Sequence, residues 1–530
     1  MVRHTRQIAL LKGESWWGGA SFDGVLMPFD AGSRYRKDLR RINPNQAMPL
    51  LLSSKGRYVW SERPFTFSFE SGVLHLVSSD ERIELHEGSG TLREAFAQAA
   101  SRHFHLNGKI PDPLAFTAPQ YNTWTEMHLE PTQQKVLAYA EGVLANGMPP
   151  GVLIIDDNWM RDYGNLDFNR LFFPDPDEMM RRLHAMGFKV MLWVCPYVSA
   201  DGNVFMTLRR KGFLLKDHTG EPAIMEWWNG YSSLLDLSNP DAVAWFTQQL
   251  DGLAARYDVD GFKFDAGNPV MTEDGDEERY NWHTRIEENE DTFIYASIGV
   301  RYALSEYREC WKGAGLPLIQ RQQDKAHVWG KSGLSDLIPN GLAQSIMGYA
   351  YNCPDLIGGG SDAICVDDGR PDIDQELFIR YAQCSTLFPM MQFSVAPWRV
   401  LDETHLGYCM EMVRLRMKMG PEILALALKA ADTGEPIMRP MEYVYPGKGY
   451  HEVVDQFMLG DDILVAPILE KGARTRKIHF PEGNWVDESG ALYPGGVCSE
   501  VLARISWLPW FRRVEMRPSD RGIPEGPGVL

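Results

Sequence analysis

Two aspartates in this chain have neighbours and spacing that suit catalytic carboxylates. The first, Asp265, ends the segment Asp260-Gly-Phe-Lys-Phe-Asp265. The side chains of a β-strand alternate with a period of two, so Lys263 and Asp265 would lie on the same side of a strand here. A lysine beside a carboxylate keeps that carboxylate ionised, as a nucleophile must be. A buried Lys–Asp pair that caps a strand has the same spacing, and spacing alone favours neither interpretation.

The second aspartate, Asp324, lies 59 residues after Asp265, just beyond the apolar segment Leu316–Arg321. The two segments are consecutive strand candidates, so we expect one step of a sheet between them. Two carboxylates on adjacent strands can flank one glycosidic bond, and retaining glycosidases hold such a pair about 5–5.5 Å apart. Taken alone, Asp324 is more typical of a solvated loop residue.

The elements that would position these aspartates alternate in the pattern of a (β/α)8 barrel. Short apolar segments are followed in most cases by helical stretches such as Asp241–Arg256. Catalytic groups of such barrels lie at the C-terminal ends of the strands, and the loops Gly267–Glu290 and Gly358–Asp374 would lie over that end. The eight predicted strands are Phe116–Trp124, Val152–Asp156, Lys189–Val194, Gly261–Asp265, Leu316–Arg321, Tyr349–Asp355, Leu387–Phe393 and Pro436–Met441.

Strand-like segments lie on both sides of the predicted barrel. Before about residue 105, segments such as Phe65–Phe69 and Val73–Val77 alternate apolar and polar residues, which predicts an antiparallel β-sandwich. After about residue 440, short segments such as Ile463–Pro467 predict a small β-domain. We therefore expect an α/β chain with an N-terminal β-sandwich domain over residues 1–108, a catalytic (β/α)8 TIM barrel over 109–435 and a C-terminal β-domain over 436–530.

The composition excludes several classes of protein. Of the 530 residues, 44% are hydrophobic and 11% aromatic, which excludes a disordered or collagen-like chain. The 53 Lys and Arg residues against 71 Asp and Glu residues give a net charge of −18, which repels phosphate backbones and anionic lipid surfaces. No apolar run reaches the ~18 residues of a membrane span. We expect neither a nucleic-acid partner nor a membrane partner.

The cysteines and histidines also bear on location and cofactors. Seven cysteines without a CxxC pair predict reduced thiols, and the apolar run Ile8–Leu11 is shorter than the ~7–15 residues of a signal-peptide core. We therefore expect a cytoplasmic enzyme. No histidines have metal-ligand spacing, Gly358–Gly360 lacks the lysine of a phosphate loop, and the acidic segment Glu273–Glu278 lacks the calcium-loop pattern. No metal and no cofactor are expected.

Several motifs taken together resemble those of glycoside hydrolase family 31. They are KFDAGN at 263–268, the segment around Asp324, PDLIGGG at 354–360 and FMLGDDILVAP at 457–467, so the resemblance covers about residues 110 to 500. It implies a retaining α-glycosidase in which Asp265 is the nucleophile and Asp324 is the general acid/base. It also implies that Asp156 and Arg321 bind the sugar.

Further sugar-binding candidates lie at the ends of predicted strands. Asp157 follows Asp156 and would point to the opposite face unless the strand has already ended. For Trp124 and Trp193, stacking on a sugar and simple burial are equal alternatives. The complete set of predicted substrate-binding residues is Trp124, Asp156, Asp157, Trp193, Lys263, Arg321, Asp355 and Ser394.

Ser394 bears on which sugar is bound. α-Glucosidases of the resembled family have a histidine after the seventh predicted strand, where this chain has Ser394. This departure and the surrounding motifs resemble the α-galactosidase-like branch, the group of the myogenesis-regulating glycosidase. We expect a terminal α-galactoside in a small oligosaccharide or glycoside as the substrate. The alternatives are an α-glucosidase, α-xylosidase or sulfoquinovosidase, or a catalytically silent carbohydrate-binding relative; homo-oligomer formation stays open.

Overall fold

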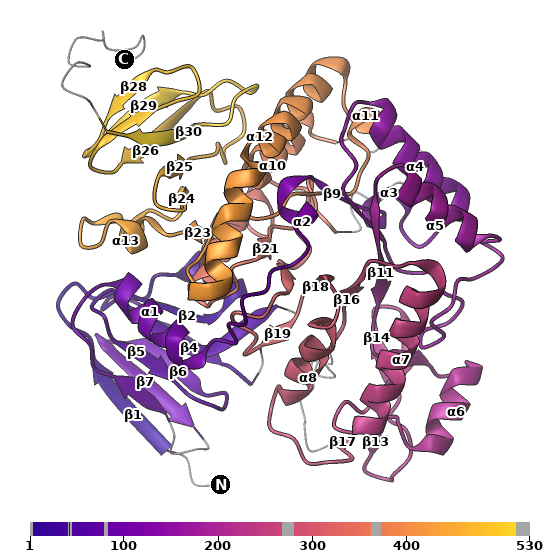
Figure 1. Cartoon of the computed structure of the whole chain (residues 1–530). Coiled ribbons are helices and arrows are strands. Elements are labelled where there is room, and N and C mark those ends of the chain that lie inside the picture. Colours follow the sequence, from indigo (N-terminus) through magenta and orange to yellow (C-terminus); the bar gives the residue numbers. More distant parts are fainter. Residues whose placement is uncertain are drawn as a thin grey trace.

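Eight parallel strands form the centre of the computed structural model, which describes residues 4–40, 42, 45–78, 83–267, 280–361 and 373–515. Their order is β21-β20-β18-β16-β11-β10-β9-β22. Leu356, just after β21, forms a parallel bridge with Gln392 of β22, so the sheet is nearly closed into a barrel (Figure 1). The strands are β9 (Gln120–Asn122), β10 (Val152–Ile155), β11 (Lys189–Val194), β16 (Gly261–Phe264), β18 (Leu304–Tyr307), β20 (Ile319–Arg321), β21 (Asn352–Cys353) and β22 (Gln392–Phe393).

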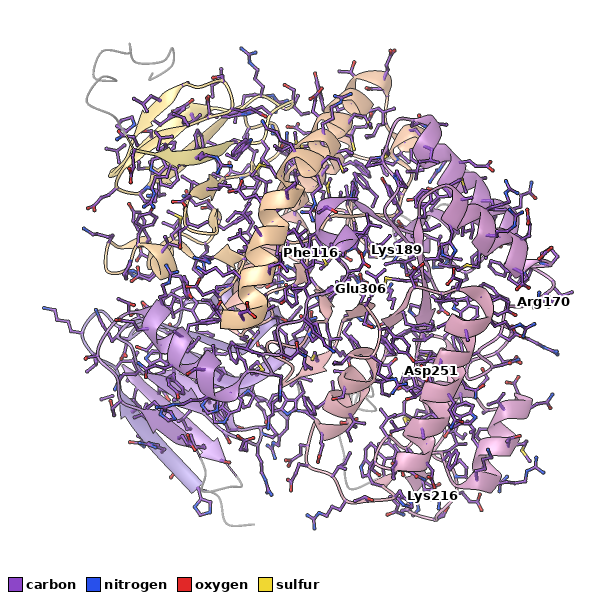
Figure 2. All side chains as sticks on the ribbon, in the orientation of Figure 1. Phe116, Arg170, Lys189, Lys216, Asp251 and Glu306 are labelled. Carbon is purple, nitrogen blue, oxygen red and sulfur yellow. The ribbon has the colours of Figure 1, made fainter. Side chains whose placement is uncertain are left out.

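Seven of the eight predicted strands contain a barrel strand, and the eighth prediction was wrong. Pro436–Met441 contains β23 (Met438–Arg439), which pairs antiparallel with β24 (Phe457–Leu459) outside the barrel. The missing barrel strand is β18, which reads Leu-Ser-Glu-Tyr and so lacks an apolar run. Its Glu306 is fully buried and lies at the centre of the molecule (Figure 2).

The helices that follow the strands surround the barrel (Figure 1). Local signals fix their first turns: Asn239 and Asp175 accept hydrogen bonds from backbone N–H groups, and a proline follows each of them. The main helices are α4 (Gln133–Ala145), α5 (Pro176–Ala185), α7 (Pro240–Tyr257), α8 (Glu290–Gly299), α9 (Leu337–Ile346), α10 (Gln375–Thr386) and α12 (Glu403–Thr433).

An insertion between β11 and α7 adds a small layer of its own. It contains α6 (Asn203–Lys211) and a three-stranded sheet in the order β12-β15-β14. Strands β14 (Met225–Trp227) and β15 (Gly230–Leu234) form a hairpin in which Trp227 pairs with Gly230, and β12 (Tyr197–Ser199) completes the sheet. The tip of the hairpin is therefore Trp228-Asn229. Because loops that follow strands lie at the C-terminal end of a barrel, the hairpin is in reach of any site there.

The N-terminal part consists of two sheets, as the predicted β-sandwich requires. Helix α1 (Leu92–His103) follows them, and β19 (Cys310–Trp311) joins one sheet to the barrel region by parallel pairing with β4. One sheet has the order β1 (His4–Ala9), β7 (Val73–Ser78), β6 (Thr66–Glu70) and β3 (Tyr35–Asp38). The other contains β4 (Gln46–Ser53), β5 (Tyr58–Trp60) and β8 (Glu84–His86), with β2 (Trp16–Ala20) on β4.

The C-terminal part is a small β-domain on the same side of the barrel as the N-terminal sheets (Figure 1). The predicted fold class is thereby confirmed, whereas the boundaries at residues 108 and 435 stay predictions. None of the helices in the described ranges is long and apolar enough to cross a membrane. The remaining strands of this domain are β25 (Ile463–Val465), β26 (Thr475–Phe480), β27 (Asn484–Val486), β28 (Leu492–Pro494), β29 (Val497–Leu502) and β30 (Trp510–Val514).

The close packing of β16 against β18 leads to the first testable prediction. A Cβ atom on Gly261 would lie 1.9 Å from the backbone oxygen of Leu304, so Gly261→Ala must separate the two strands. We expect a loss of about 3 kcal/mol in the free energy of unfolding, measured by urea denaturation. Gly252→Ala is the control: this exposed glycine of α7 has no atom within 4 Å of the added Cβ and should gain about 0.5–1 kcal/mol. Equal midpoints for the two variants would contradict the packing argument.

Candidate active site

A cleft with a volume of about 280 Å³ opens at the C-terminal ends of the barrel strands. Eight of the ten predicted site residues line it, although they come from segments between residues 124 and 324. Only Asp355 and Ser394 do not. The lining residues are Trp124, His128, Leu129, Asp156, Asp157, Trp193, Trp228, Asn229, Lys263, Asp265, Arg308, Arg321, Asp324 and Leu356.

Asp265 follows β16 and is held by two hydrogen bonds and one salt bridge. Its Oδ1 accepts a hydrogen bond from the Ala266 backbone N–H at 3.0 Å and lies 2.8 Å from Nη2 of Arg308. Its Oδ2 accepts one from the Trp193 indole at 3.1 Å. Burial raises the pKa of Asp265, but Arg308 and, to a smaller extent, Lys263 outweigh burial and lower the pKa to about 2. Asp265 is therefore ionised at neutral pH, as a nucleophile requires.

The partner of Lys263 differs from the one expected. Its Nζ lies 2.5 Å from Oδ2 of Asp156, and both side chains are buried. The direct cationic partner of Asp265 is instead Arg308, and Lys263 acts on it only through the field of its charge. The alternation of side chains identified the correct face of β16, but it could not identify the partner from another strand.

Asp324 contacts the other terminal nitrogen of the Arg308 guanidinium. Its Oδ1 accepts a hydrogen bond from Nη1 of Arg321 at 2.8 Å, and its Oδ2 is 3.5 Å from Nη1 of Arg308. The side chain is 40% exposed, toward the cleft. Burial raises the pKa of Asp324, but Arg321 and then Arg308 lower it below its usual value.

The expectation of one sheet step between the two aspartates was wrong. Strand β18 lies between β16 and β20, so the separation is two steps. Arg308 directly follows β18, the intervening strand, and this position lets its guanidinium reach both carboxylates.

Asp355 lies beneath the cleft and not in its wall. Its Oδ1 accepts a hydrogen bond from Nη1 of Arg321 at 2.6 Å, and its Oδ2 accepts one from the Lys325 backbone at 2.7 Å. Burial raises the pKa of Asp355 to about 6, because Arg321 offsets only part of that effect and the neighbouring Asp324 adds to it. Glu306 is the third carboxyl group near Arg321, 3.4 Å from its Nε.

Strand β10 ends at Ile155, so the alternation of side chains along a strand does not apply to Asp156 and Asp157. Both residues line the cleft. The two aspartates have different partners. Asp156 has the salt bridge to Lys263, whereas Asp157 accepts a hydrogen bond from the Tyr163 hydroxyl at 3.0 Å. Burial and then the charge of Asp156 raise the pKa of Asp157 to about 7.

The two predicted tryptophans lie in the cleft, but Ser394 does not. Trp193 is only 1% exposed and uses its indole N–H on Asp265, while the Trp124 indole donates to the Gly360 carbonyl at 2.9 Å. Ser394 is fully buried, and its hydroxyl accepts a hydrogen bond from the Thr125 backbone at 2.8 Å. Sugar binding by Ser394 stays a prediction that its position does not favour.

Sequence reasoning missed Arg308 and the hairpin tip. Trp228 is 47% exposed, and the Arg308 guanidinium carbon lies 5.3 Å from the centre of its ring. The pair Asn229-Gly230 is a recognisable hairpin signal. The period of two in β18 could also have placed Glu306 and Arg308 on one face.

Outside the cleft, one group in the described ranges has the composition of a metal site. Ligand atoms of Glu84, His86 and His103 lie within 4.8 Å of one another. Arg102 donates to Nδ1 of His86 at 2.7 Å, so the ring proton is on Nε2, which is 2.8 Å from Glu84. The ring of His86 therefore has no lone pair left for a metal in this arrangement. The acidic segment Glu273–Glu278 lies outside the described residues.

Comparisons with known proteins identify the family of this chain. Residues 113–426 match the model of the glycosyl hydrolases family 31 TIM-barrel domain, and residues 434–515 match the family 31 C-terminal domain. The mouse myogenesis-regulating glycosidase is 33% identical over 405 residues, which cover 74% of this chain and 55% of that protein. The predicted resemblance to that group is confirmed.

Two further matches widen the comparison. The SITS-binding protein of Tetronarce californica is 28% identical over 328 residues, covering 58% of this chain and 45% of that protein. The chain thus spans about half the length of these curated relatives. The structure of a Flavobacterium johnsoniae GH31 dextranase, complexed with glucose, matches with a TM-score of 0.84 and 20% identity, over 96% of this chain and 66% of that one. At that identity the match supports the fold alone.

The second prediction concerns the uncompensated charge of Asp157. Its pKa is raised on folding, so the folded state binds more protons than the unfolded state and stability falls as pH rises from about 4 to about 7. Asp157→Asn keeps the shape and removes the charge. We expect it to raise the free energy of unfolding by about 1–3 kcal/mol at pH 8 and to have little effect at pH 4.

The exposed Asp201 provides the control, because Asp201→Asn makes the same change of side chain at a residue outside the cleft. Denaturant titrations at pH 4 and pH 8 measure the difference. An effect of Asp157→Asn that does not vary with pH would contradict the raised pKa.

Proposed function

The chain belongs to glycosyl hydrolase family 31, and from that membership we propose that it is a retaining α-glycosidase that releases a terminal α-linked galactose from a small oligosaccharide or glycoside. One observation carries the mechanism: Arg308 bridges Asp265 and Asp324 within the cleft. Retaining hydrolysis needs a nucleophilic carboxylate and a second carboxyl group across one glycosidic bond. The shared contact with Arg308 supports Asp265 as the nucleophile and Asp324 as the general acid/base.

In the first step, a carboxylate oxygen of Asp265 attacks the anomeric carbon. The bond from that carbon to the leaving oxygen breaks, and Asp324 gives its proton to the oxygen. This step requires that the substrate complex hold Asp324 protonated, although Arg321 and Arg308 lower its pKa in the free site. Arg308 and Lys263 keep Asp265 ionised for the attack. The sugar is then bound to Asp265 with inverted configuration.

In the second step, Asp324 takes a proton from water while the water oxygen attacks the anomeric carbon and Asp265 leaves. Two inversions restore the α configuration. In the free site the charge of Asp265 raises the pKa of Asp324, against the effect of Arg321 and Arg308. Esterification removes that charge, so the pKa of Asp324 falls as its role changes from acid to base.

The charges in the cleft nearly balance. Four carboxyl groups line it, those of Asp156, Asp157, Asp265 and Asp324, against the three cations Lys263, Arg308 and Arg321. The mechanism needs a protonated Asp324, and the pKa of Asp157 is about 7, so these charges do not separate an uncharged sugar from a sulfonated one. Asp156 and Asp157 lie side by side and can accept hydrogen bonds from two neighbouring hydroxyls, as O4 and O6 on one face of galactose require.

A catalytically silent carbohydrate-binding protein is the second candidate. The relative named SITS-binding protein supports it, since that name describes binding. The ionised Asp265 beside Asp324 supports catalysis instead, because binding alone does not require two bridged carboxylates. The cytoplasmic location stays a prediction.

The third prediction separates the roles of the two carboxylates. Asp265→Ala should lose turnover of every α-glycoside by at least about 10³-fold, whereas Asp324→Ala should retain activity on aryl glycosides whose leaving groups need no proton. Added azide should restore both variants but give products of opposite configuration. It should give a β-glycosyl azide with Asp265→Ala and an α-glycosyl azide with Asp324→Ala.

Nuclear magnetic resonance of the azide products reads their configuration directly. Wild-type protein with azide is the control and should give the sugar alone. The same azide configuration from both variants, or full hydrolysis by Asp265→Ala, would refute the assignment.

The fourth prediction concerns the glycone. We expect kcat/KM for aryl α-galactoside to exceed that for aryl α-glucoside by at least about 10²-fold, because a buried polar group loses its partner with the wrong epimer. Aryl α-xyloside and α-sulfoquinovoside complete the panel under the same conditions. An equal or higher value for the glucoside would refute the galactosidase proposal and leave the mechanism intact.

A further inference from the structure

Asp157 is a buried carboxyl group in the cleft without a salt bridge to any residue in the described ranges. It is 2% exposed, and the ammonium group of Lys263 forms its salt bridge with the adjacent Asp156 instead. A buried carboxyl group with a like charge beside it is costly to keep. An uncompensated group that lines a cleft is therefore a candidate for contact with a ligand.

Two residues from distant segments fix the orientation of Asp157. The Tyr163 hydroxyl lies 3.1 Å and 3.0 Å from its two oxygens, and the Asn229 amide nitrogen lies 3.5 Å from Oδ2. The Asn229 amide also donates to the Tyr163 hydroxyl. Tyr163 lies between β10 and α5, and Asn229 lies at the tip of the β14–β15 hairpin. Only the hairpin and the β10 loop together can build this arrangement.

Tyr163 is itself held on several sides. Its backbone N–H donates to the Ser199 hydroxyl at 3.0 Å, and its carbonyl accepts from the Ser199 backbone at 3.0 Å. Its ring meets Trp227 and Trp193 edge to face, with centroids 4.9 Å and 6.0 Å away. The hydroxyl of Tyr163 therefore has a fixed position, and its hydrogen bond to Asp157 fixes the orientation of that carboxyl group.

We propose that Tyr163 and Asn229 are positioning residues that aim Asp157 at one hydroxyl of the sugar and so select the glycone; this rests on the proposed function. Asp157 and Asn229 line the cleft, whereas Tyr163 acts from behind them. A hydroxyl both donates and accepts hydrogen bonds, so it suits Asp157 in either protonation state. A charged substituent would suit only one of them.

The experiment uses the full chain with Tyr163→Phe and Asn229→Ala. The substrate is the aryl α-glycoside that the wild-type protein hydrolyses fastest, together with its monodeoxy analogues. We expect each variant to raise KM about 10-fold and to change kcat by less than about 3-fold, because the lost contact acts equally before and in the transition state. Against one monodeoxy analogue the loss should vanish, since the hydroxyl that Asp157 binds is missing there.

Tyr231→Phe is the matched control. It removes a hydroxyl from the same hairpin, but the residue is 64% exposed and does not line the cleft. It should leave kcat and KM unchanged. Thermal unfolding checks that the variants fold. If Tyr163→Phe is unstable, Asn229→Ala at the hairpin tip still tests the proposal. Equal losses on every monodeoxy analogue, or no loss on any substrate, would overturn the inference.

Failure of the proposed function has a different outcome. A wild-type protein that hydrolyses no α-glycoside would refute the glycosidase proposal. The variants would then be titrated calorimetrically with free galactose, glucose and xylose. Binding of one sugar that weakens about 10-fold in Tyr163→Phe would still support the positioning role. Unchanged binding in the variant, or no binding of any of the three sugars by the wild-type protein, would overturn it.

Discussion

Two arginines make the charged end of the barrel possible. Arg308 lies between Asp265 and Asp324, and Arg321 reaches Asp324, Asp355 and Glu306. Burying a carboxylate is costly unless it is paired and hydrogen-bonded, and removing one partner of a buried pair leaves the other uncompensated. The nearly closed sheet holds the two arginines in place because each is at or just past the end of a barrel strand. The geometry of the cleft therefore depends on these two side chains.

The same cluster separates the carboxyl groups by their pKa values. Arg308 and Lys263 lower the pKa of Asp265 to about 2, whereas burial raises that of Asp355 to about 6 and that of Asp157 to about 7. Environments that separate the pKa values of neighbouring acids allow these acids to have different roles at one pH. Asp265 is suited to remain charged, while Asp157 can change its protonation state near neutral pH.

The sequence allowed the barrel and most of the cleft to be predicted, because strand alternation and strand ends are local patterns. Lys263 and Asp265 were found this way, and Asp156 through the resemblance to family 31. Strand β18 was missed because Glu306 makes it look polar, and the partners of that residue, Arg321 and Gln392, lie on other strands. Ser394 was placed in the site because it stands where α-glucosidases of the family have a histidine, but its hydroxyl accepts a hydrogen bond from the Thr125 backbone and does not line the cleft. Contacts between separate segments decide such cases, and no local pattern contains them.

The proposed chemistry and the proposed recognition of the sugar depend on different kinds of element. Asp265 and Arg321 lie at the ends of barrel strands, where the sheet fixes them to within the precision that catalysis needs. Tyr163 and Asn229 lie on loops that the barrel does not constrain directly. The Trp228 ring covers the Arg308 guanidinium from the same hairpin, which shields the ion pairs of the cleft from water and strengthens them. The hairpin thus joins the two proposed functions, because one turn both covers Arg308 and contacts Asp157, the carboxyl group that we propose recognises the sugar.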